Sequence, residues 1–327
     1  MRILIVKLGA IGDVIRTTSI LEGLKGNEID WLTSSAAKPI LLNNAFINKI
    51  YTWEEREQLK PYDLVISLED DFEVCQFASS RFEKAIKGAY IKDGKVVYTP
   101  SRWFDMSAIS KFGLEKANEL KKLNKKTFQE HMGELLGTKV GGYVFELTEE
   151  EKKYGIKVAR DWGLGTGKNK KVIGINTGAG GRWEMKALTI EKTIELVKRL
   201  EKELDVTCLI LGGEAEQARN EEISKATGAA NAGIHSLRNF AAIINQCDVL
   251  VTSDSLAMHF GIALKKKIVS FFGPTSAVEI ELYGLGEKVC PEMDCLTCYR
   301  KACDKEPSCM DTLAVGDLFE AVRNLMS

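Results

Sequence analysis

The sequence has 327 residues, which exceeds the length of a typical single domain and predicts two domains. Its formal net charge of -1 provides no general basic field, so nucleic acid is not an expected partner. No apolar run is long enough to span a bilayer and residues 3–6 are too short for a signal peptide, so we expect a cytoplasmic protein.

The first residues, MRILIVKLGAIGDVIRTT, form the most informative stretch of the chain. Residues 3–6 predict a buried parallel strand because the run is apolar and rich in β-branched side chains. The strand runs into the loop Gly9-Ala10-Ile11-Gly12, and a helix follows with Asp13 in its first turn. Because α/β proteins place their chemistry at the carboxyl ends of such strands, we expect Asp13 at the mouth of a crevice. A second interpretation is that Asp13 only places a favourable charge at the positive end of the helix dipole.

Short strands alternate with helices through the rest of the first half, which predicts a parallel α/β sheet. We expect a helix at residues 36–43 and strands at residues 28–33, 49–53, 64–68, 87–91 and 96–99. Glu69-Asp70-Asp71 follows one of these strands and could hold a divalent metal, although a solvated loop is the simpler interpretation. Residues 102–136 are helical in pattern and rich in lysine. Such a face is either a solvated surface or a contact for an anionic acceptor or lipid headgroups.

The stretch GLGTGKNKK at residues 163–171 has the composition of a linker, so we place the domain boundary there. The first domain then covers residues 1–165 and ends with a helix at 149–162, and the second covers residues 170–327. The expected elements of the second domain are strands at 171–175, 207–211, 248–252 and 267–272 and helices at 190–203, 237–246 and 256–264. This order predicts an α/β protein with two doubly wound, Rossmann-like parallel sheets that face each other across a cleft.

Three loops of the second domain are expected to converge, because loops that follow parallel strands open on one edge of the sheet. Glycines, a lysine and a helix N-terminus are suitable parts for binding a diphosphate. A carboxylate such as Glu216 can accept hydrogen bonds from both hydroxyls of a ribose. Each residue is a weak signal by itself. The candidate donor-binding residues are Thr177, Gly178, Arg182, Lys186, Glu216, Asp254, Ser255, Leu256, Ala257 and His259.

The segments KLGAIGDVIRTT, GAGGRWEMKALTIEKTIEL, GGEAE and SDSLAMHFGIALKKKIVSFFGPTS, in this order, resemble glycosyltransferase family 9, the ADP-heptose:lipopolysaccharide heptosyltransferases. The resemblance covers nearly the whole chain and implies the GT-B fold, with the acceptor bound by the first domain and the nucleotide sugar by the second. It implies that Asp13 is the general base beside the acceptor-side loop of Gly9, Ala10 and Gly12. It also implies that Lys186 holds the diphosphate, that Glu216 binds the ribose, and that residues 254–257 with His259 line the diphosphate and sugar pocket.

The chain departs from the family pattern at two places. Lys186 is followed by Ala187-Leu188-Thr189, where family members commonly have Lys-Arg-Trp-Pro before the helix. Leu256 stands where a glycine is frequent after the family's Asp-Ser or Asp-Thr. These departures bear on which sugar is transferred more than on the class of reaction.

The implied function is inverting transfer of a heptose-like sugar from ADP-heptose to a lipopolysaccharide core-type acceptor. A carboxylate that takes the proton of the attacking hydroxyl contributes about 10² to 10⁴ in rate. No convincing Asp-x-Asp metal site is present, so we expect no catalytic metal, and Lys186, Arg182 and the helix start at Ser255 stabilise the leaving group. The expected partners are a nucleotide diphosphate sugar, a lipid-linked saccharide and, transiently, the inner face of the cytoplasmic membrane. The alternatives are another nucleotide sugar or acceptor, or a nucleotide-sugar-binding protein without turnover.

Five of the eight cysteines lie within residues 290–309, before the C-terminal helix. The other three are scattered in apolar segments and are most simply reduced core residues. The cluster has the spacing of a four-thiolate structural site for zinc or iron, and free thiols are the alternative. A related subgroup, the autotransporter heptosyltransferases, has cysteine-bound iron. The expected ligands are Cys295, Cys298, Cys303 and Cys309.

Overall fold

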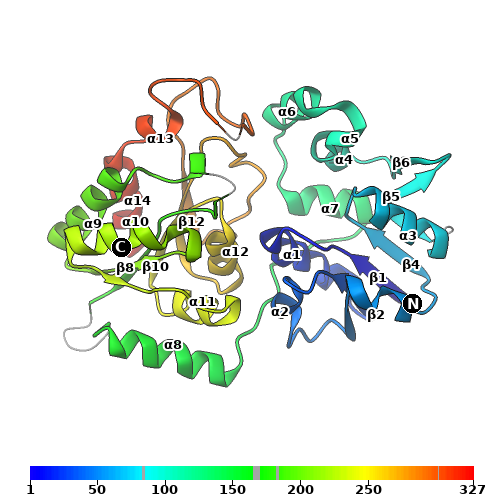
Figure 1. The fold of residues 1–327 in the computed structure, drawn as a ribbon, viewed down its shortest axis with the longest axis horizontal. Coiled ribbons are helices and arrows are strands. Elements are labelled where there is room, and N and C mark those ends of the chain that lie inside the picture. The colour runs from blue at the N-terminus through cyan, green and yellow to red at the C-terminus, as the bar shows by residue number, and fades with distance from the viewer. Residues whose placement is uncertain (83–84, 165–169, 182–183, 301) are drawn as a thin grey trace. The chain divides into compact units, whose positions relative to one another are not determined.

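In a computed structural model, which describes residues 1–82, 85–164, 170–181, 184–300 and 302–327, the chain forms two compact units (Figure 1). Unit 1 contains Met1–Glu146 and the short segment Val278–Glu281. Unit 2 contains Leu147–Ala277 and Leu282–Ser327. Each unit is built on a six-stranded sheet with helices packed against it. The predicted α/β fold with two doubly wound sheets is therefore confirmed.

The sheet of unit 1 has the strand order β3-β2-β1-β4-β5-β6. Its strands are β1 (Arg2–Val6), β2 (Glu28–Thr33), β3 (Lys49–Thr52), β4 (Leu64–Ser67), β5 (Ile86–Lys92) and β6 (Lys95–Tyr98). β1 lies between β2 and β4 and its apolar residues are almost wholly buried, as expected of a central parallel strand. β6 is antiparallel to β5, which corrects the expectation of a purely parallel sheet. Asp93 and Gly94 have positive φ and form the tight turn that folds β6 back.

The helices of unit 1 are shorter than the sequence pattern predicts. They are α1 (Ile11–Thr17), α2 (Lys38–Leu41), α3 (Phe72–Phe82), α4 (Arg102–Ser107), α5 (Ile109–Phe112), α6 (Leu114–Lys122) and α7 (Phe128–Leu136), with 3₁₀ helices at Thr18–Ile20, Glu22–Leu24 and Trp53–Gln58. The helical stretch expected at residues 102–136 is thus divided among four helices. Gly113 has positive φ before α6, and Thr127 starts α7 through a capping box with Glu130.

The sheet of unit 2 has the order β12-β11-β10-β7-β8-β9, and all of its strands are parallel. The strands are β7 (Val172–Asn176), β8 (Thr207–Leu211), β9 (Ala230–Asn231), β10 (Val249–Ser253), β11 (Lys267–Phe271) and β12 (Gly286–Val289). The central strands β7 and β10 are buried along their whole length, and both are near-continuous apolar runs. The edge strands β9 and β12 were not expected from the sequence.

Helices cover both faces of the unit 2 sheet, with α9, α10 and α14 on one face and α11 and α12 on the other (Figure 1). The bounds are α8 (Glu149–Asp161), α9 (Ile190–Leu204), α10 (Gln217–Thr227), α11 (Leu237–Ile244), α12 (Leu256–Ala263), α13 (Cys309–Thr312) and α14 (Val315–Met326), with 3₁₀ helices at Glu184–Lys186 and Glu214–Glu216. α9 buries Thr193, Leu196, Val197 and Leu200, the three-to-four spacing of an amphipathic helix. In the described ranges, no helix combines the length and apolar character that crossing a membrane requires.

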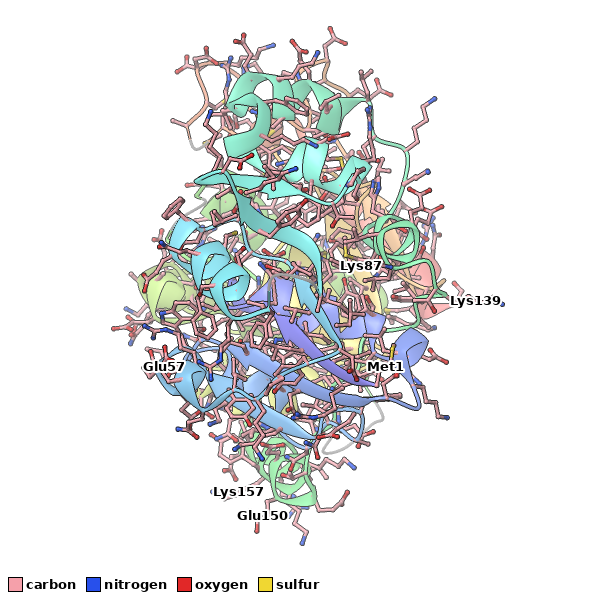
Figure 2. The ribbon with its side chains drawn as sticks, turned by 90° about the vertical axis from the view of Figure 1, so that its right-hand side faces the viewer. Met1, Glu57, Lys87, Lys139, Glu150 and Lys157 are labelled. Carbon is pink, nitrogen blue, oxygen red and sulfur yellow. The ribbon has the colours of Figure 1, made fainter. Side chains whose placement is uncertain are left out.

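The contacts of α8 place it in unit 2, although the sequence boundary was expected after it. Glu151 on α8 pairs with Arg238 on α11, with Oε2 of the carboxylate 2.9 Å from Nη2 of the guanidinium. The two helices approach closely, because a Cβ added at Gly155 would lie 2.3 Å from the carbonyl oxygen of Ala242. Glu150 and Lys157 point away from the protein on the opposite, exposed face of α8 (Figure 2). The boundary between the units therefore lies after Glu146 rather than at residues 163–171.

The close approach of α8 and α11 gives a stability test. In an open helix, replacing glycine with alanine stabilises by up to about 1 kcal/mol. We expect Gly155→Ala instead to lower the free energy of unfolding by about 1–3 kcal/mol, because the new methyl group overpacks the contact with Ala242. Urea denaturation measures the change. Ile156→Ala is the control, since Ile156 is 49% exposed and its truncation is expected to change stability by less than about 0.5 kcal/mol. A gain in stability for Gly155→Ala would contradict the packing.

Candidate functional site

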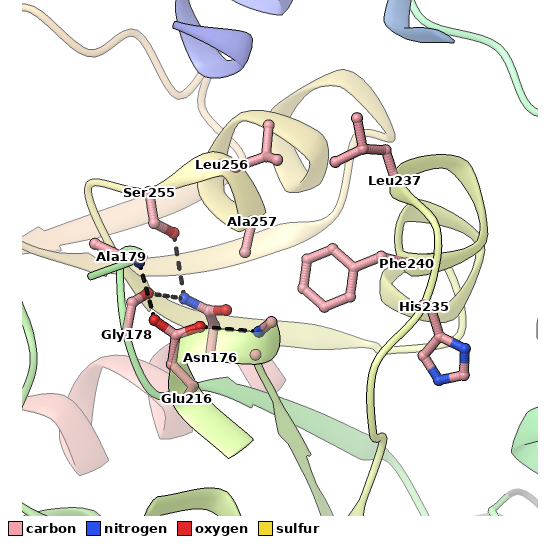
Figure 3. Close-up of a pocket in the computed structure, with 13 residues that line it drawn as sticks. Asn176, Gly178, Ala179, Glu216, His235, Leu237, Phe240, Ser255, Leu256 and Ala257 are labelled. Atoms are coloured by element: carbon pink, nitrogen blue, oxygen red, sulfur yellow. Dashed lines mark hydrogen bonds between the residues drawn. The ribbon is translucent and has the colours of Figure 1, made fainter. Parts of the chain in front are cut away.

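Unit 2 contains a cavity of about 250 Å³ at the carboxyl ends of β7, β8 and β10 (Figure 3). The loops after these three strands supply one side of it, and the segment leading into α11 supplies the other. Parallel sheets characteristically bind ligands at this edge. The lining residues are Asn176, Gly178, Ala179, Gly180, Gly212, Gly213, Glu216, His235, Leu237, Phe240, Ser255, Leu256 and Ala257.

Glu216 joins two of the glycine loops. Its Oε1 accepts a hydrogen bond from the N–H of Gly180, and its Oε2 accepts one from the N–H of Gly213, both at 2.9 Å. A Cβ at Gly178 would lie 2.5 Å from Oε1, so only glycine lets the loop pass so close to the carboxylate. Glu216 is 7% exposed. Because each carboxylate oxygen has two lone-pair sites, acceptor capacity for a ligand remains after these two bonds.

Asn176 connects the loop after β7 to the start of α12. Its Nδ2 donates to the carbonyl of Gly178 at 2.6 Å and to Oγ of Ser255 at 3.2 Å. Sequence reasoning missed Asn176, although a polar residue at the end of an otherwise apolar strand is a usable signal. Thr177, which was expected in the site, does not line the cavity and bonds to Asn220.

Lys186 lies beside Asp254, the residue immediately before Ser255. Its Nζ donates to Oδ2 of Asp254 at 2.8 Å and to the backbone carbonyl of Asp254 at 2.9 Å, and 11% of the lysine side chain is exposed. Burial raises the pKa of Asp254, but the charges of Lys186 and His259 and hydrogen bonds from Lys186 and Thr275 outweigh it and lower the pKa to about 2. The carboxylate is therefore ionised near neutral pH.

The outcome for the expected donor residues is mixed. Gly178, Glu216, Ser255, Leu256 and Ala257 lie together around the cavity. Lys186, Asp254 and His259 lie next to the start of α12 but outside the lining, and Arg182 falls outside the described residues.

Apolar side chains of two helices also line the cavity. Phe240 and Leu237 of α11 point toward it from one side, and Leu256 and Ala257 of α12 lie across from them (Figure 3). His235 at the rim is fixed on both ring nitrogens, by the Tyr154 hydroxyl at 2.9 Å and the carbonyl of Ala232 at 2.6 Å. Sequence reasoning missed Phe240 and Leu237, because apolar residues at the start of an amphipathic helix look like ordinary core residues. A polar floor opposite an apolar wall suits a ligand with a phosphate group at one end and a flat ring at the other.

In unit 1, Glu69 holds the glycine loop that precedes α1. One oxygen, Oε1, accepts hydrogen bonds from the N–H groups of Leu8 and Gly9, at 2.6 and 3.1 Å, and from Nζ of Lys7 at 2.9 Å. Ala10 is the N-cap of α1, and Gly12 lies in its first turn. The sequence had marked Glu69 only as part of an acidic stretch, whereas the structure gives it a defined role in shaping this loop.

Asp13 lies in the first turn of α1 with 38% of its side chain exposed. Its Oδ1 is 2.7 Å from Nη2 of Arg16, and Arg16 also lies 3.9 Å from a carboxylate oxygen of Glu279. The residues around this pair, Trp103 and Phe128, stack against the guanidinium. Asp13 is thus a solvent-accessible carboxylate supported by a largely buried cation.

The four-thiolate metal site expected at the cysteine cluster is not formed. Across the part of the chain that the structure describes, no group of three or more His, Cys, Asp or Glu side chains is arranged to hold a metal ion. Cys309 starts α13 and packs in the core of unit 2, whereas Cys303 is exposed. Burial, followed by the nearby Cys298, Cys303 and Cys295, raises the pKa of Cys309 to about 11. In the described structure these cysteines form no disulfide bonds.

Comparison with known proteins gives a family match and several structural neighbours. The family model described as glycosyltransferase family 9 (heptosyltransferase) matches residues 58–308, a range that begins after the Asp13 loop. Lipooligosaccharide heptosyltransferase 2 of Campylobacter jejuni is 29% identical over 171 residues, which cover 48% of this chain and 51% of that protein. The chain thus spans about half the length of the curated relatives it matches.

Several solved structures cover almost the entire chain. The glycosyltransferase family 9 protein of Veillonella parvula has a TM-score of 0.78, with 17% identity over 99% of this chain and 97% of that chain. The E. coli heptosyltransferase WaaC, solved with ADP, has a TM-score of 0.62, with 16% identity over 100% of both chains. These likenesses show the fold, which is the GT-B class of two parallel-sheet α/β domains.

Proposed function

The chain belongs to glycosyltransferase family 9, and from this premise we propose that it is an inverting glycosyltransferase that moves a heptose-like sugar from ADP-heptose to a lipopolysaccharide core-type acceptor. The observation that carries the proposal is the unit 2 cavity, in which two glycine-containing loops and the start of α12 lie opposite apolar side chains of α11. In this proposal unit 2 binds the nucleotide sugar and unit 1 binds the acceptor.

The donor fits the cavity by chemistry. Backbone N–H groups of the glycine loops and the first turn of α12 favour the negative diphosphate. The oxygens of Glu216 face the cavity and suit the ribose hydroxyls, and the ring of Phe240 offers a flat surface for the base. A structure of the related WaaC contains ADP, which supports the choice of nucleotide.

The proposed reaction is a single displacement. The acceptor hydroxyl attacks the anomeric carbon, the bond from that carbon to the diphosphate oxygen breaks, and the configuration inverts. Asp13 takes the proton of the attacking hydroxyl, because a neutral hydroxyl is a weak nucleophile near pH 7. The exposed position of the Asp13 side chain leaves it accessible to such a hydroxyl.

The departing nucleoside diphosphate needs compensation for the charge it gains. Lys186 is a cation beside the start of α12, where its Nζ contacts Asp254. The helix N-terminus at Ser255 adds a fixed partial positive charge. Together they provide the electrostatic stabilisation that this step requires.

A lipid-linked acceptor places the proposed reaction at the inner face of the cytoplasmic membrane. The segment spanning α5 and α6 has exposed apolar side chains at Phe112, Leu114 and Leu123, which are 51%, 53% and 69% exposed. Lysines accompany them in the sequence, including Lys122 and Lys125. Exposed apolar groups beside cations suit transient contact with an anionic lipid surface.

A binding panel tests the donor. Thermal shift and calorimetry with ADP, UDP, GDP and CDP are expected to show the strongest stabilisation by ADP, because ligands that bind only the folded state raise the melting temperature. Turnover with ADP-heptose then separates a transferase from a protein that only binds the nucleotide sugar. If another nucleotide stabilises the protein most strongly, the donor is a sugar of that nucleotide rather than ADP-heptose. If ADP-heptose binds but is not transferred to any of a range of saccharide acceptors, the protein binds nucleotide sugars without turnover.

A further inference from the structure

Arg16 is a side chain in direct contact with the proposed base. Its Nη2 lies 2.7 Å from Oδ1 of Asp13, three residues earlier on α1. The guanidinium carbon lies 4.4 Å from the ring centre of Phe128 and 5.3 Å from that of Trp103. Only 12% of the Arg16 side chain is exposed. The two rings therefore hold the guanidinium, and the guanidinium in turn holds the carboxylate of Asp13.

Glu279 supplies a second carboxylate to the same guanidinium. Its Oε2 lies 3.9 Å from Nη1 of Arg16, and 8% of its side chain is exposed. Glu279 belongs to the segment Val278–Glu281, and its carbonyl accepts a hydrogen bond from the N–H of Phe128 at 3.0 Å. The residue that stacks on Arg16 thus also fixes the backbone of Glu279. One largely buried cation is shared by an accessible carboxylate and a buried one.

We propose that Arg16 and Glu279 are positioning residues that set the proton affinity of Asp13 in opposite directions. The proposal rests on the role of Asp13 as the base. Arg16 favours the ionised carboxylate, which is the form that can accept a proton. Once Asp13 is protonated, Arg16 needs another counter-charge, because a largely buried cation is costly without one. Glu279 provides that charge and so makes proton uptake by Asp13 less unfavourable.

Other charged groups near Asp13 limit the size of the effect. Lys121 of α6 is close enough to interact with this cluster; burial lowers its pKa, Glu279 and Asp13 act to raise it, and Arg16 acts to lower it. On the preceding loop, Lys7 pairs with Glu69. α2 also packs on α1, and its Lys38 pairs with Glu55. Lys121 remains when Arg16 is removed, and Asp13 is partly exposed, so the shifts are expected at the lower end of the range for ion pairs.

The test measures the proton affinity of Asp13 in two ways. The first is the acidic limb of the pH profile of kcat/KM, and the second is a ¹³C NMR titration of the aspartate carboxyl groups, with the Asp13 signal identified by its absence in Asp13→Asn. Arg16→Met is expected to move the midpoint of the acidic limb and the midpoint of the NMR titration to higher pH by about one unit, because the ionised form of Asp13 loses its cation. Glu279→Gln is expected to move both midpoints to lower pH by about half a unit. The double variant is expected to lie about half a unit above wild type, which is the sum of the two shifts.

Arg56→Met is the matched control. Arg56 also stacks 4.4 Å from an aromatic ring, that of Trp53, and also lies 3.9 Å from a carboxylate, that of Glu73. It is expected to leave the pH profile unchanged. Shifts of the same sign in Arg16→Met and Glu279→Gln, or no shift in folded variants, would overturn the inference. If Asp13→Asn keeps full turnover, the role of Asp13 as base fails, while the NMR titration still decides whether Arg16 and Glu279 control its pKa.

Discussion

Replacing Asp13 with asparagine is expected to lower turnover by at least about a hundredfold and to leave ADP affinity unchanged. Asparagine has nearly the same shape but cannot take the proton of the acceptor hydroxyl. A hundredfold loss corresponds to about 2.7 kcal/mol in the activation free energy, which is within the range of a single general base. Steady-state kinetics with ADP-heptose and a saccharide acceptor measure turnover, and calorimetry measures ADP affinity.

Asp71→Asn is the matched control for Asp13. Asp71 also lies at a helix start, where its side chain accepts hydrogen bonds from the N–H groups of Glu73 and Val74. Because asparagine caps a helix as well as aspartate does, Asp71→Asn is expected to keep both stability and turnover. If Asp13→Asn behaves in the same way, Asp13 only places a favourable charge at the start of α1, and the base must be another group.

Replacing Lys186 with methionine is expected to weaken ADP binding by about 1.5–3 kcal/mol, the contribution of a hydrogen bond to a charged group. This corresponds to a loss of about 10- to 150-fold in affinity. Two effects combine, because the diphosphate loses a cation and the carboxylate of Asp254 loses the partner that holds it at 2.8 Å. Titration calorimetry with ADP gives the change directly.

A second variant separates these two effects. If Lys186 only neutralises Asp254, the double variant Lys186→Met/Asp254→Asn should bind ADP as tightly as the wild type. If Lys186 also holds the diphosphate, the double variant should remain at least about tenfold weaker, and this is the result we expect. Lys198→Ala, on the exposed face of α9, is the control and should bind ADP normally. Unchanged affinity in Lys186→Met would place the diphosphate elsewhere.

The central strands could be predicted from sequence because burial on both faces leaves a local signal. β1, β7 and β10 are short, mainly apolar runs. β7 and β10 end in small polar residues, and β1 is followed within three residues by Gly9. The edge strands β9 and β12 leave no such signal. β12 has the sequence GEKV and becomes a strand only through its pairing with β11. The strands β5 and β6 were both predicted, but their antiparallel pairing was missed although a local signal was present, since Asp93-Gly94 is a typical dipeptide of a two-residue hairpin turn.

The part of the site that could be predicted from sequence consists of polar residues in the short loops that follow the strands. Glu216 and Ser255 lie in such loops and line the cavity as expected. Phe240 could not be distinguished from a core residue, because the same apolar spacing serves packing and ligand contact. Glu279 was beyond sequence reasoning, since its partner Arg16 lies near the other end of the chain and only the tertiary fold brings them together.

The segment Val278–Glu281 restricts how this protein can be recombined. The chain changes unit after Glu146 and again on either side of this segment, so neither unit is a single continuous stretch. A chimera joined only at residue 146 would combine Arg16 of one parent with Glu279 of the other. Donor specificity therefore cannot be exchanged between relatives as an independent module unless these four residues are exchanged with the N-terminal part. The contact between Arg16 and Glu279 also predicts that the residues at positions 16 and 279 covary among homologues.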